Sequence, residues 1–319
     1  MNARRSHASW RALITTTLVL TLLAAACGDD GDSSTSNDDQ GSVGEFEGTL
    51  RIGAIPDQDL EVLQRTYDSV ADHVEAAMPG VTVEYVPVTD YEGAVTGFRV
   101  GDLDVVWFGG LTGVQARLEV EDAQALVQRD IDEAFTTVFI ASVDSGLGPI
   151  ADVDGLTALS GHSLTFGSES STSGRLMPQY FLIEAGVDVD TDLSGQVGYS
   201  GSHDATIEVV SAGTYEVGAL NSQVWDDRSA EGVVDGEKVT EIFRTPPYYD
   251  YHWVGRPDID ERLGDGATEA FVDALLALDA DDPDDAAILE LFGAGSFIRT
   301  ENGNYDAIEA VARDVGLIR

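Results

Sequence analysis

The residues with the clearest chemistry are four consecutive hydroxyl side chains at 170–173, within the segment SESSTSG. The apolar segment before them, SLTFG, predicts a strand, and the segment after them, RLMPQYFLIEAG, predicts a helix. Ser171, Thr172 and Ser173 would then lie at a helix N-terminus, where backbone N–H groups lack intrahelical partners and the helix dipole is positive. Such a turn can bind a tetrahedral oxyanion, although Ser and Thr are also ordinary helix N-caps.

A second turn, GYSGSHDA, repeats this arrangement of strand, glycine-rich turn and helix. His203 could donate a hydrogen bond to an anion, although a lone histidine is more often structural. Asp204 could accept from a protonated ligand oxygen or cap its own helix. Because both turns follow the carboxyl ends of strands, they point to one crevice.

Three turns in the first half of the chain also end predicted strands, and they have the sequences IPDQD, TDY and WFGG. They supply Asp57, Tyr91 and Gly109 as candidates for the facing side of the same site. Tyr91 begins a predicted helix at a strand end, where its hydroxyl could face the cleft or its ring could belong to the core. Trp107 lies within an apolar run, which favours the core.

A later segment, PPYYDYHW, combines four aromatic residues with a carboxylate and a histidine. It lies where the chain is expected to cross between two parts of the fold. Asp250 either faces a ligand there or packs in a hinge, and a buried carboxylate needs a partner in both cases.

The elements that must position these residues alternate between strands and helices. Strands are predicted at LRIGAIP, VTVEYVPV and DLDVVWFG, with helical spacing between them at 60–78 and at about 90–100. This is the doubly wound α/β pattern. A strand at 136–146 leaves this unit, and a second unit of the same kind starts after Leu156.

The chain is expected to cross back at 245–257, and the helices after it would complete the first unit. We therefore expect two α/β lobes, with lobe 1 formed by residues 49–145 and 250–319 and lobe 2 by residues 146–249. About 270 residues follow Gly48, which suits two lobes better than one small core. Two crossovers create a cleft at the hinge, where a ligand would bind.

The N-terminal segment has the features of an export signal. Arginines precede an apolar run that starts at Leu13 and ends in small residues before Cys27, the only cysteine. We interpret residues 1–26 as a lipoprotein signal peptide, Cys27 as the lipidated residue and residues 27–48 as a flexible tether. A transmembrane anchor is the alternative, but the apolar run is shorter than the roughly 20 residues that a spanning helix needs.

The charge balance limits the classes of partner. The formal net charge is −41, and removal of a signal peptide with three arginines and no acidic residue would change it to −44. Lys238 is the only lysine. Nucleic acids and anionic membrane surfaces both require a basic patch, so neither is expected as a partner. The five histidines show no metal-ligand spacing, and no metal or other cofactor is expected.

The chain resembles the phosphonate/phosphite substrate-binding proteins of ABC importers. The resemblance lies in the hydroxyl-rich turn, GSHDA and the TPPYYDY crossover, which follow a lipobox (the small residues and cysteine that end at Cys27) and a tether. The resemblance runs from about Leu50 to the C-terminus, and it implies a type II periplasmic-binding-protein fold with a ligand cleft at the hinge. The motifs IPD, VPVTDY, WFGG, SSTSG, LMP, GSHDAT, GALN, PPYYDY and FIRTENGNYDAIEA are similar to a subgroup usually labelled selenate-binding.

The resemblance also implies roles for individual residues. The ligand-binding positions of the family that match this sequence fall on Ser171, Thr172, Ser173, His203, Tyr91 and Asp250, and the GALN motif adds Asn221. The family's GPxxY aromatic corresponds to about Gly113, so part of an aromatic wall is missing or is supplied by Trp107 or Phe108. The acidic residue with which aminoalkylphosphonate binders hold an ammonium group corresponds to about Gln223, which cannot provide that charge. A small oxyanion is therefore expected rather than a long aminated phosphonate.

Selenate conflicts with a carboxylate in the cleft. It is fully ionised at neutral pH and only accepts hydrogen bonds, whereas phosphite, phosphate and methylphosphonate can keep a P–OH that donates to Asp250. The expected function is capture of a small tetrahedral oxyanion, of the phosphite, phosphonate or phosphate type or selenate, outside the cytoplasm by a lipid-anchored protein that serves an ABC permease and its ATPase; the protonatable oxyanions are favoured if Asp250 lines the cleft.

Two other functions remain open at this point. A binding protein of this kind could instead present its ligand to a membrane receptor kinase. A hydrolase could use Ser171 or Ser173 with His203, but the serines lack a GxSxG elbow and His203 is only adjacent in sequence to Asp204.

Overall fold

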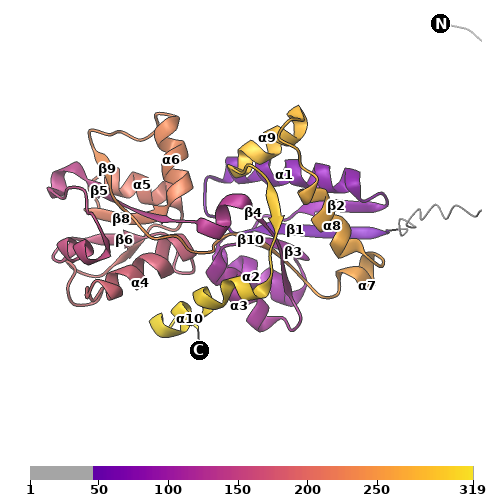
Figure 1. Cartoon of the computed structure of the whole chain (residues 1–319), viewed down its shortest axis with the longest axis horizontal. Helices are drawn as coiled ribbons and strands as arrows, with labels where there is room; N and C mark the ends of the chain where they lie inside the picture. Colours follow the sequence, from indigo (N-terminus) through magenta and orange to yellow (C-terminus); the bar gives the residue numbers. More distant parts are fainter. Residues whose placement is uncertain (1–45, 319) are drawn as a thin grey trace, which may run out of the picture. The chain divides into compact units, whose positions relative to one another are not determined.

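The computed structural model describes residues 46–318 (Figure 1). The signal peptide predicted at 1–26, the lipidation site Cys27 and nearly all of the tether predicted at 27–48 lie outside these residues. Within the described part of the chain, none of the helices combines the length and apolar character required to cross a bilayer.

The first sheet is mixed and has six strands within residues 46–318, in the order β11-β4-β10-β3-β1-β2. Its strands are β1 (Gly48–Ala54), β2 (Val81–Tyr85), β3 (Val105–Phe108), β4 (Gln124–Arg129), β10 (His252–Gly255) and β11 (Phe297–Arg299). β1 pairs in parallel with β2 and β3, whereas β10 lies antiparallel between β3 and β4. The helices of this lobe are α1 (Leu60–Ala77), α2 (Tyr91–Val100), α3 (Gly110–Glu119), α7 (Ile259–Leu263), α8 (Ala267–Leu276) and α9 (Pro283–Phe292).

The second sheet has five strands in the described chain, in the order β7-β6-β8-β5-β9. Its strands are β5 (Thr137–Ser142), β6 (Leu164–Phe166), β7 (Gly198–Tyr199), β8 (Val217–Asn221) and β9 (Val239–Arg244). Its helices are α4 (Met177–Glu184), α5 (His203–Ser211) and α6 (Ser222–Ala230). β6 pairs in parallel with β7 and β8, and β5 pairs antiparallel with β8 and β9. The two sheets confirm the expected two-lobed α/β fold.

The predicted boundary of lobe 1 at residue 145 is wrong by one strand. The strand expected at 136–146 is present as β5, but it lies in the second sheet between β8 and β9. All of β5 is buried, as a central strand of either sheet would be, so its apolar run could not show which sheet it joins. The first crossover is instead the short 3₁₀ segment η1 (Asp130–Ala134) and the residues just after it.

The two crossovers lie side by side at the hinge. Phe135 and Tyr248 exchange two backbone hydrogen bonds of 2.9 Å each, and the Asp250 N–H donates to the Asp132 carbonyl at 3.2 Å. A short antiparallel ribbon therefore connects the lobes. It also holds Asp250 at the junction between them.

The C-terminal helix α10 (Asp306–Val315) was expected to complete lobe 1, but it contacts both lobes. It lies against α3 on one side and against α4 and η4 (Thr172–Leu176) on the other. Its buried residues Ile308 and Ala312 belong to the same apolar cluster as Leu176 and Phe181 of lobe 2. Figure 1 shows this helix, in yellow, beside α2, α3 and the lower part of the second lobe.

Candidate ligand-binding site

The hydroxyl-rich turn follows β6 and opens with a single π-helical turn, η4, before α4 begins. Ser171 is its N-cap, and its Oγ accepts a 2.9 Å hydrogen bond from the Gly174 N–H. Ser171, Thr172 and Ser173 are buried, with at most 2% of each exposed. Single π-helical turns are uncommon and frequently mark functional sites. A simple cap on the surface would leave these hydroxyls in water, so their burial favours the ligand-site interpretation.

The N-terminus of α3, in lobe 1, faces this turn. The Leu111 N–H donates to Thr172 Oγ1 at 3.0 Å, and the Gly110 N–H donates to Asp250 Oδ1 at 2.9 Å. A Cβ atom at Gly109 would lie 2.9 Å from Thr172 Oγ1 and 3.2 Å from Asp250 Oδ1. The close approach of the lobes at this point therefore requires glycine.

Three buried oxygens around this junction make no hydrogen bond of good geometry among residues 46–318, although Ser171 lies close to the Tyr91 hydroxyl and Tyr248 close to Ser173. They are the Tyr91 hydroxyl of lobe 1, the Ser173 hydroxyl of lobe 2 and Oδ2 of Asp250 on the crossover. Tyr91 and Asp250 are close enough that the carboxylate helps to raise the pKa of the phenol well above its usual value, although burial is the larger cause. Buried polar atoms without partners cost free energy and are rare in folded proteins. Together they offer two hydroxyl groups and one carboxylate oxygen to a ligand.

Asp250 is completely buried, and burial raises the pKa of its carboxyl to about 7. The Gly110 N–H and the Thr172 hydroxyl act in the opposite direction because they favour the charged form. The carboxyl can therefore gain or lose a proton near neutral pH. A carboxylate in this position accepts a hydrogen bond from a protonated ligand oxygen and repels an oxygen that carries no proton.

His203 belongs to a network that joins the lobes. Its Nδ1 accepts from the Asn221 N–H at 3.3 Å, so the proton is on Nε2, which donates to the Tyr251 hydroxyl oxygen at 3.2 Å. The Asn221 side chain also donates to that oxygen, at 3.1 Å, and the Tyr251 hydroxyl donates to Asp57 Oδ2 at 2.8 Å. Burial lowers the pKa of His203 to about 4, so the ring is neutral.

The network shows where three of the predicted ligand-binding residues lie. Asp57, His203 and Asn221 are brought together where the two lobes meet, and the His203 N–H also donates to the Asp57 carbonyl at 2.9 Å. Both ring nitrogens of His203 already have partners in the protein. Burial raises the pKa of Asp57 to about 6. That these residues touch the ligand stays a prediction.

Asp204 and Gln223 are occupied by other contacts. Asp204 accepts from Arg228 Nε at 2.7 Å and from the Asp59 N–H of lobe 1 at 3.0 Å, while Ser202 caps α5. The Gln223 side chain bonds to Arg129 and to the carbonyl of Phe292, both in lobe 1. Both side chains thus contact the opposite lobe.

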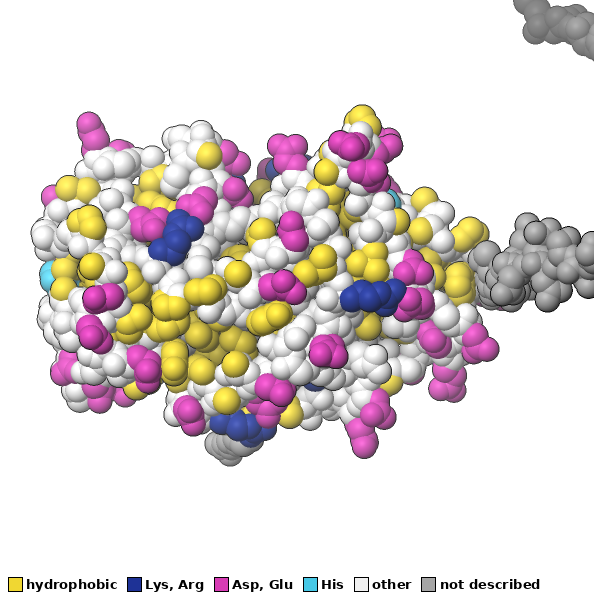
Figure 2. Space-filling model, in the orientation of Figure 1, with side chains coloured by type: hydrophobic (Ala, Val, Ile, Leu, Met, Phe, Trp, Pro, Cys, Tyr) yellow, Lys and Arg dark blue, Asp and Glu magenta, His cyan; other side chains and the backbone are white. Residues whose placement is uncertain are grey.

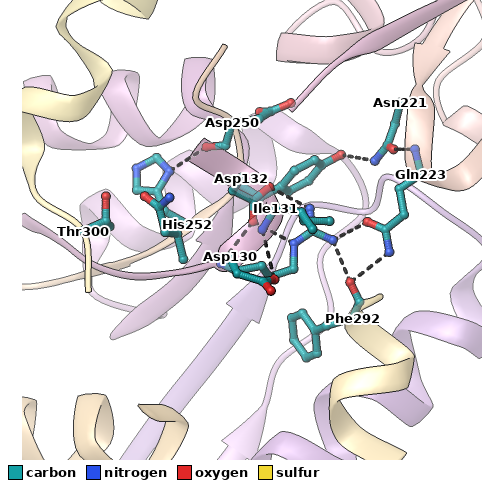
Figure 3. A network of polar contacts seen from close by, with 12 residues as sticks. Asp130, Ile131, Asp132, Asn221, Gln223, Asp250, His252, Phe292 and Thr300 are labelled. Carbon is teal, nitrogen blue, oxygen red and sulfur yellow. Dashed lines mark hydrogen bonds and ion pairs between the residues drawn. The ribbon is translucent and has the colours of Figure 1, made fainter. Parts of the chain in front are cut away.

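Arg129, which is not among the residues predicted from the sequence, lies at the centre of the hinge. Its guanidinium donates to both carboxylate oxygens of Asp132 at 2.7 Å, and it lies 5.0–5.5 Å from the ring centres of Trp107, Phe135 and Tyr251. Figure 3 shows Asp132, Gln223 and Phe292 in this network of polar contacts. An arginine that ends an apolar strand, with an aspartate three residues later, is the signal that could have identified it. Within residues 46–318, no group of His, Cys, Asp and Glu side chains could hold a metal ion.

Comparison with known proteins identifies the family. The model for the family "ABC transporter, phosphonate, periplasmic substrate-binding protein" matches residues 52–305. The chain is 43% identical over 270 residues to "Probable ABC transporter phosphite binding protein PhnD1" of Prochlorococcus marinus, covering 85% of this chain and 91% of that protein. The chain belongs to the family of periplasmic substrate-binding proteins of phosphonate ABC transporters.

Solved structures agree with this assignment. The structure of PhnD1 from Prochlorococcus marinus in complex with methylphosphonate superposes with a TM-score of 0.82 at 42% identity, over 85% of this chain and 99% of the other. A phosphonate-transporter component from Pseudomonas aeruginosa, 17% identical, shares the fold with a TM-score of 0.71 over 83% of this chain and 85% of the other. Members of this family are extracytoplasmic substrate-binding proteins of importers, so this chain is a binding protein and not an enzyme.

One departure from the phosphonate-binding pattern has a structural explanation. Gly113 lies at about the position expected for the family's aromatic residue, and a Cβ there would collide with the ring of His252. His252 is completely buried and stacks on Tyr305, with 3.7 Å between the ring centres. Trp107, expected in the core or the aromatic wall, is buried and stacks on Tyr251 at 5.8 Å. Histidine thus fills the space beside position 113.

Proposed function

We propose that the cleft captures a small tetrahedral phosphorus oxyanion that keeps a proton, such as phosphite or methylphosphonate, for delivery to an ABC permease. The buried and unpartnered Oδ2 of Asp250 carries the proposal, because it would accept a hydrogen bond from a P–OH group. PhnD1 of Prochlorococcus marinus, whose name and structure refer to phosphite and methylphosphonate, supports this choice of ligand.

The remaining ligand oxygens would be bound by donors. The hydroxyls of Tyr91 and Ser173 would each donate one hydrogen bond, since neither makes a hydrogen bond of good geometry within residues 46–318. The N-termini of α3 and of η4 add positive dipole ends on the two sides of the cleft. Local dipoles and hydroxyls have to supply this attraction because the charge of the whole chain is −41.

Ligand selectivity tests this proposal. We expect the wild-type protein to bind phosphite and methylphosphonate more tightly than selenate and sulfate, measured by calorimetric titration at pH 7.5. Asp250→Asn should weaken binding of the protonatable ligands by about 1 to 3 kcal/mol and should favour selenate and sulfate relative to them, because an amide can donate where a carboxylate repels. A wild-type preference for selenate that Asp250→Asn leaves unchanged would show that Asp250 faces away from the ligand.

We also propose that the protein is anchored by lipid on Cys27 after removal of residues 1–26. The basic residues, the short apolar run and the small residues before this cysteine support the proposal. Cys27→Ala should abolish lipidation and release the protein from the membrane fraction or leave it uncleaved, as seen by immunoblotting of fractionated cells. Cys27→Ser is a closer steric match, and a processed variant that stays in the membrane would contradict the anchor.

A further inference from the structure

Gln223 belongs to lobe 2, and both hydrogen bonds of its side chain are made to lobe 1. It is at the start of α6 in lobe 2, where its backbone N–H donates to the Asn221 side chain at 2.7 Å. Its side-chain oxygen accepts from Arg129 Nη1, at the end of β4, and its side-chain nitrogen donates to the Phe292 carbonyl at 2.9 Å. The amide is thus paired at both ends with lobe 1.

The surface that receives Gln223 is shaped for it. Phe292 is the last residue of α9, so its carbonyl has no partner within the helix, and Arg129 Nη1 also donates to it at 2.7 Å. Gly293 follows with φ of 59°, and a Cβ there would collide with the Gln223 amide. Figure 3 shows Gln223 beside the Phe292 carbonyl, with dashed contacts from both to the guanidinium group.

Arg129 connects this contact to the hinge. Both of its remaining nitrogens bind Asp132, whose carbonyl accepts from the Asp250 N–H of the second crossover. The positively charged guanidinium also lies at the negative C-terminal end of α9, where cations are stabilised. The same group therefore holds Gln223, the end of α9 and the two crossovers.

We propose that Gln223 is a positioning residue that clamps the lobes in the closed arrangement, together with Arg129 and the carbonyl of Phe292. The ligand part of this inference rests on the proposed function, whereas the clamp itself does not. Rotation of the lobes about the crossovers separates α6 from α9, so it breaks both side-chain contacts of Gln223. The clamp thus slows opening and release for every ligand equally and does not select among ligands.

Gln223→Met tests the clamp, because methionine keeps the length and packing of glutamine and removes both hydrogen bonds. Gln64→Met is the matched control, since the Gln64 side chain on α1 bonds to Asp68 of the same helix. We expect Gln223→Met to raise the dissociation rate, and with it the Kd, about tenfold for phosphite and methylphosphonate alike. Gln64→Met should leave both unchanged.

Hydrogen exchange of the full chain without ligand separates clamping from general destabilisation. Backbone N–H groups that form hydrogen bonds between the lobes include those of His203 and Asp59, to the Asp57 carbonyl and the Asp204 carboxylate respectively, and that of Leu111, to the Thr172 hydroxyl. Gln223→Met should accelerate exchange in peptides that contain them, while peptides from the centres of β1 and β8 stay protected. Uniform acceleration, or no change at His203 and Asp59, would overturn the clamp.

The binding experiment has its own negative outcome. Different fold-changes for phosphite and methylphosphonate would also overturn the proposal, because they would place Gln223 against the ligand. If the wild-type protein binds neither oxyanion, the proposed function fails, while the exchange experiment still decides whether Gln223 clamps the lobes.

Discussion

Single buried carboxylates decide how this cleft responds to protons. Asp57 and Asp250 are both buried near the hinge. Burial raises the pKa of Asp57 to about 6 and the pKa of Asp250 to about 7. Within the described chain, neither carboxylate forms an ion pair with an arginine, whereas Asp132 accepts two hydrogen bonds from Arg129. Asp57 instead relies on the Tyr251 hydroxyl and Asp250 on the Gly110 N–H.

The raised pKa of Asp57 predicts a pH-dependent contribution to stability. The folded state holds the proton more tightly than the unfolded chain, so the stabilisation is fully present below about pH 4 and is lost as the pH rises through about 6. Relative to Asp57→Asn, we expect the wild-type free energy of unfolding to fall by on the order of 3 kcal/mol between about pH 4 and pH 7.

Thermal or urea unfolding of both proteins across this range measures the difference. The comparison with Asp57→Asn is necessary because His203 has the opposite effect on stability. Burial lowers the pKa of His203 to about 4, so acid destabilises the folded protein through this residue. Asp72→Asn, an exposed change on α1, is the control and should run parallel to the wild type. A constant gap between the wild type and Asp57→Asn would show that Asp57 is not buried in the folded protein.

At the scale of elements, the sequence predicted which turns meet but not how the side chains pair. The strand ends that carry Tyr91, Gly109 and Ser171 to Ser173 could be found because strand and helix periods differ and the carboxyl ends of parallel strands share one edge. Asp250 is found separately, from the aromatic-rich crossover that carries it. Asp204 pairs with Arg228, and Gln223 pairs with Arg129 and Phe292. These partners are distant in the sequence or carry no recognisable motif. The Gln223 contacts depend on the packing of the two lobes, and the contact between Asp204 and Arg228 depends on the packing of α5 and α6 within lobe 2. No local pattern encodes either.

The membership of β5 shows the same limit. Its residues predict a buried strand correctly, yet β5 joins the second sheet through antiparallel pairing with β8 and β9. Apolar periodicity reports burial and not the identity of the neighbouring strand. The position of α10 between the two lobes has a similar cause, because an amphipathic helix buries its apolar face against whichever surfaces the preceding chain brings to it.

The N-terminus of α3 allows a sharp test at this scale. Gly109 has φ of −73°, so alanine fits its backbone, but a Cβ would press on Thr172 Oγ1 and Asp250 Oδ1 when the lobes close. We expect Gly109→Ala to weaken binding of methylphosphonate by about 1 to 3 kcal/mol, the usual cost of overpacking, without loss of the folded lobes. Gly148→Ala is the control, because nothing lies within 4 Å of its added Cβ. Equal affinities for both variants in a calorimetric titration would show that the lobes do not approach so closely at Gly109.

At the scale of the whole molecule, the protein repels the anion that it is proposed to bind. Figure 2 shows acidic side chains spread over the visible face, with few arginines and lysines among them. The chain has 58 acidic residues against 17 basic ones. A field of this sign lowers the local concentration of any anion and slows its arrival. Attraction is confined to short range, at the helix ends and hydroxyls of the closed cleft.

This balance predicts the salt dependence of ligand capture. Raising the ionic strength from 0.01 to 0.15 M shortens the screening length from about 30 Å to about 8 Å, so the repulsion should weaken while the buried contacts stay unscreened. We expect the association rate for phosphite or methylphosphonate to rise several-fold over this range, and the dissociation rate to change little, in stopped-flow measurements of tryptophan fluorescence. Sodium chloride and potassium gluconate should give the same result, which separates screening from competition by chloride. An association rate that falls with salt would instead mean that the cleft projects a positive potential into solution, and that the helix ends outweigh the acidic surface well beyond contact distance.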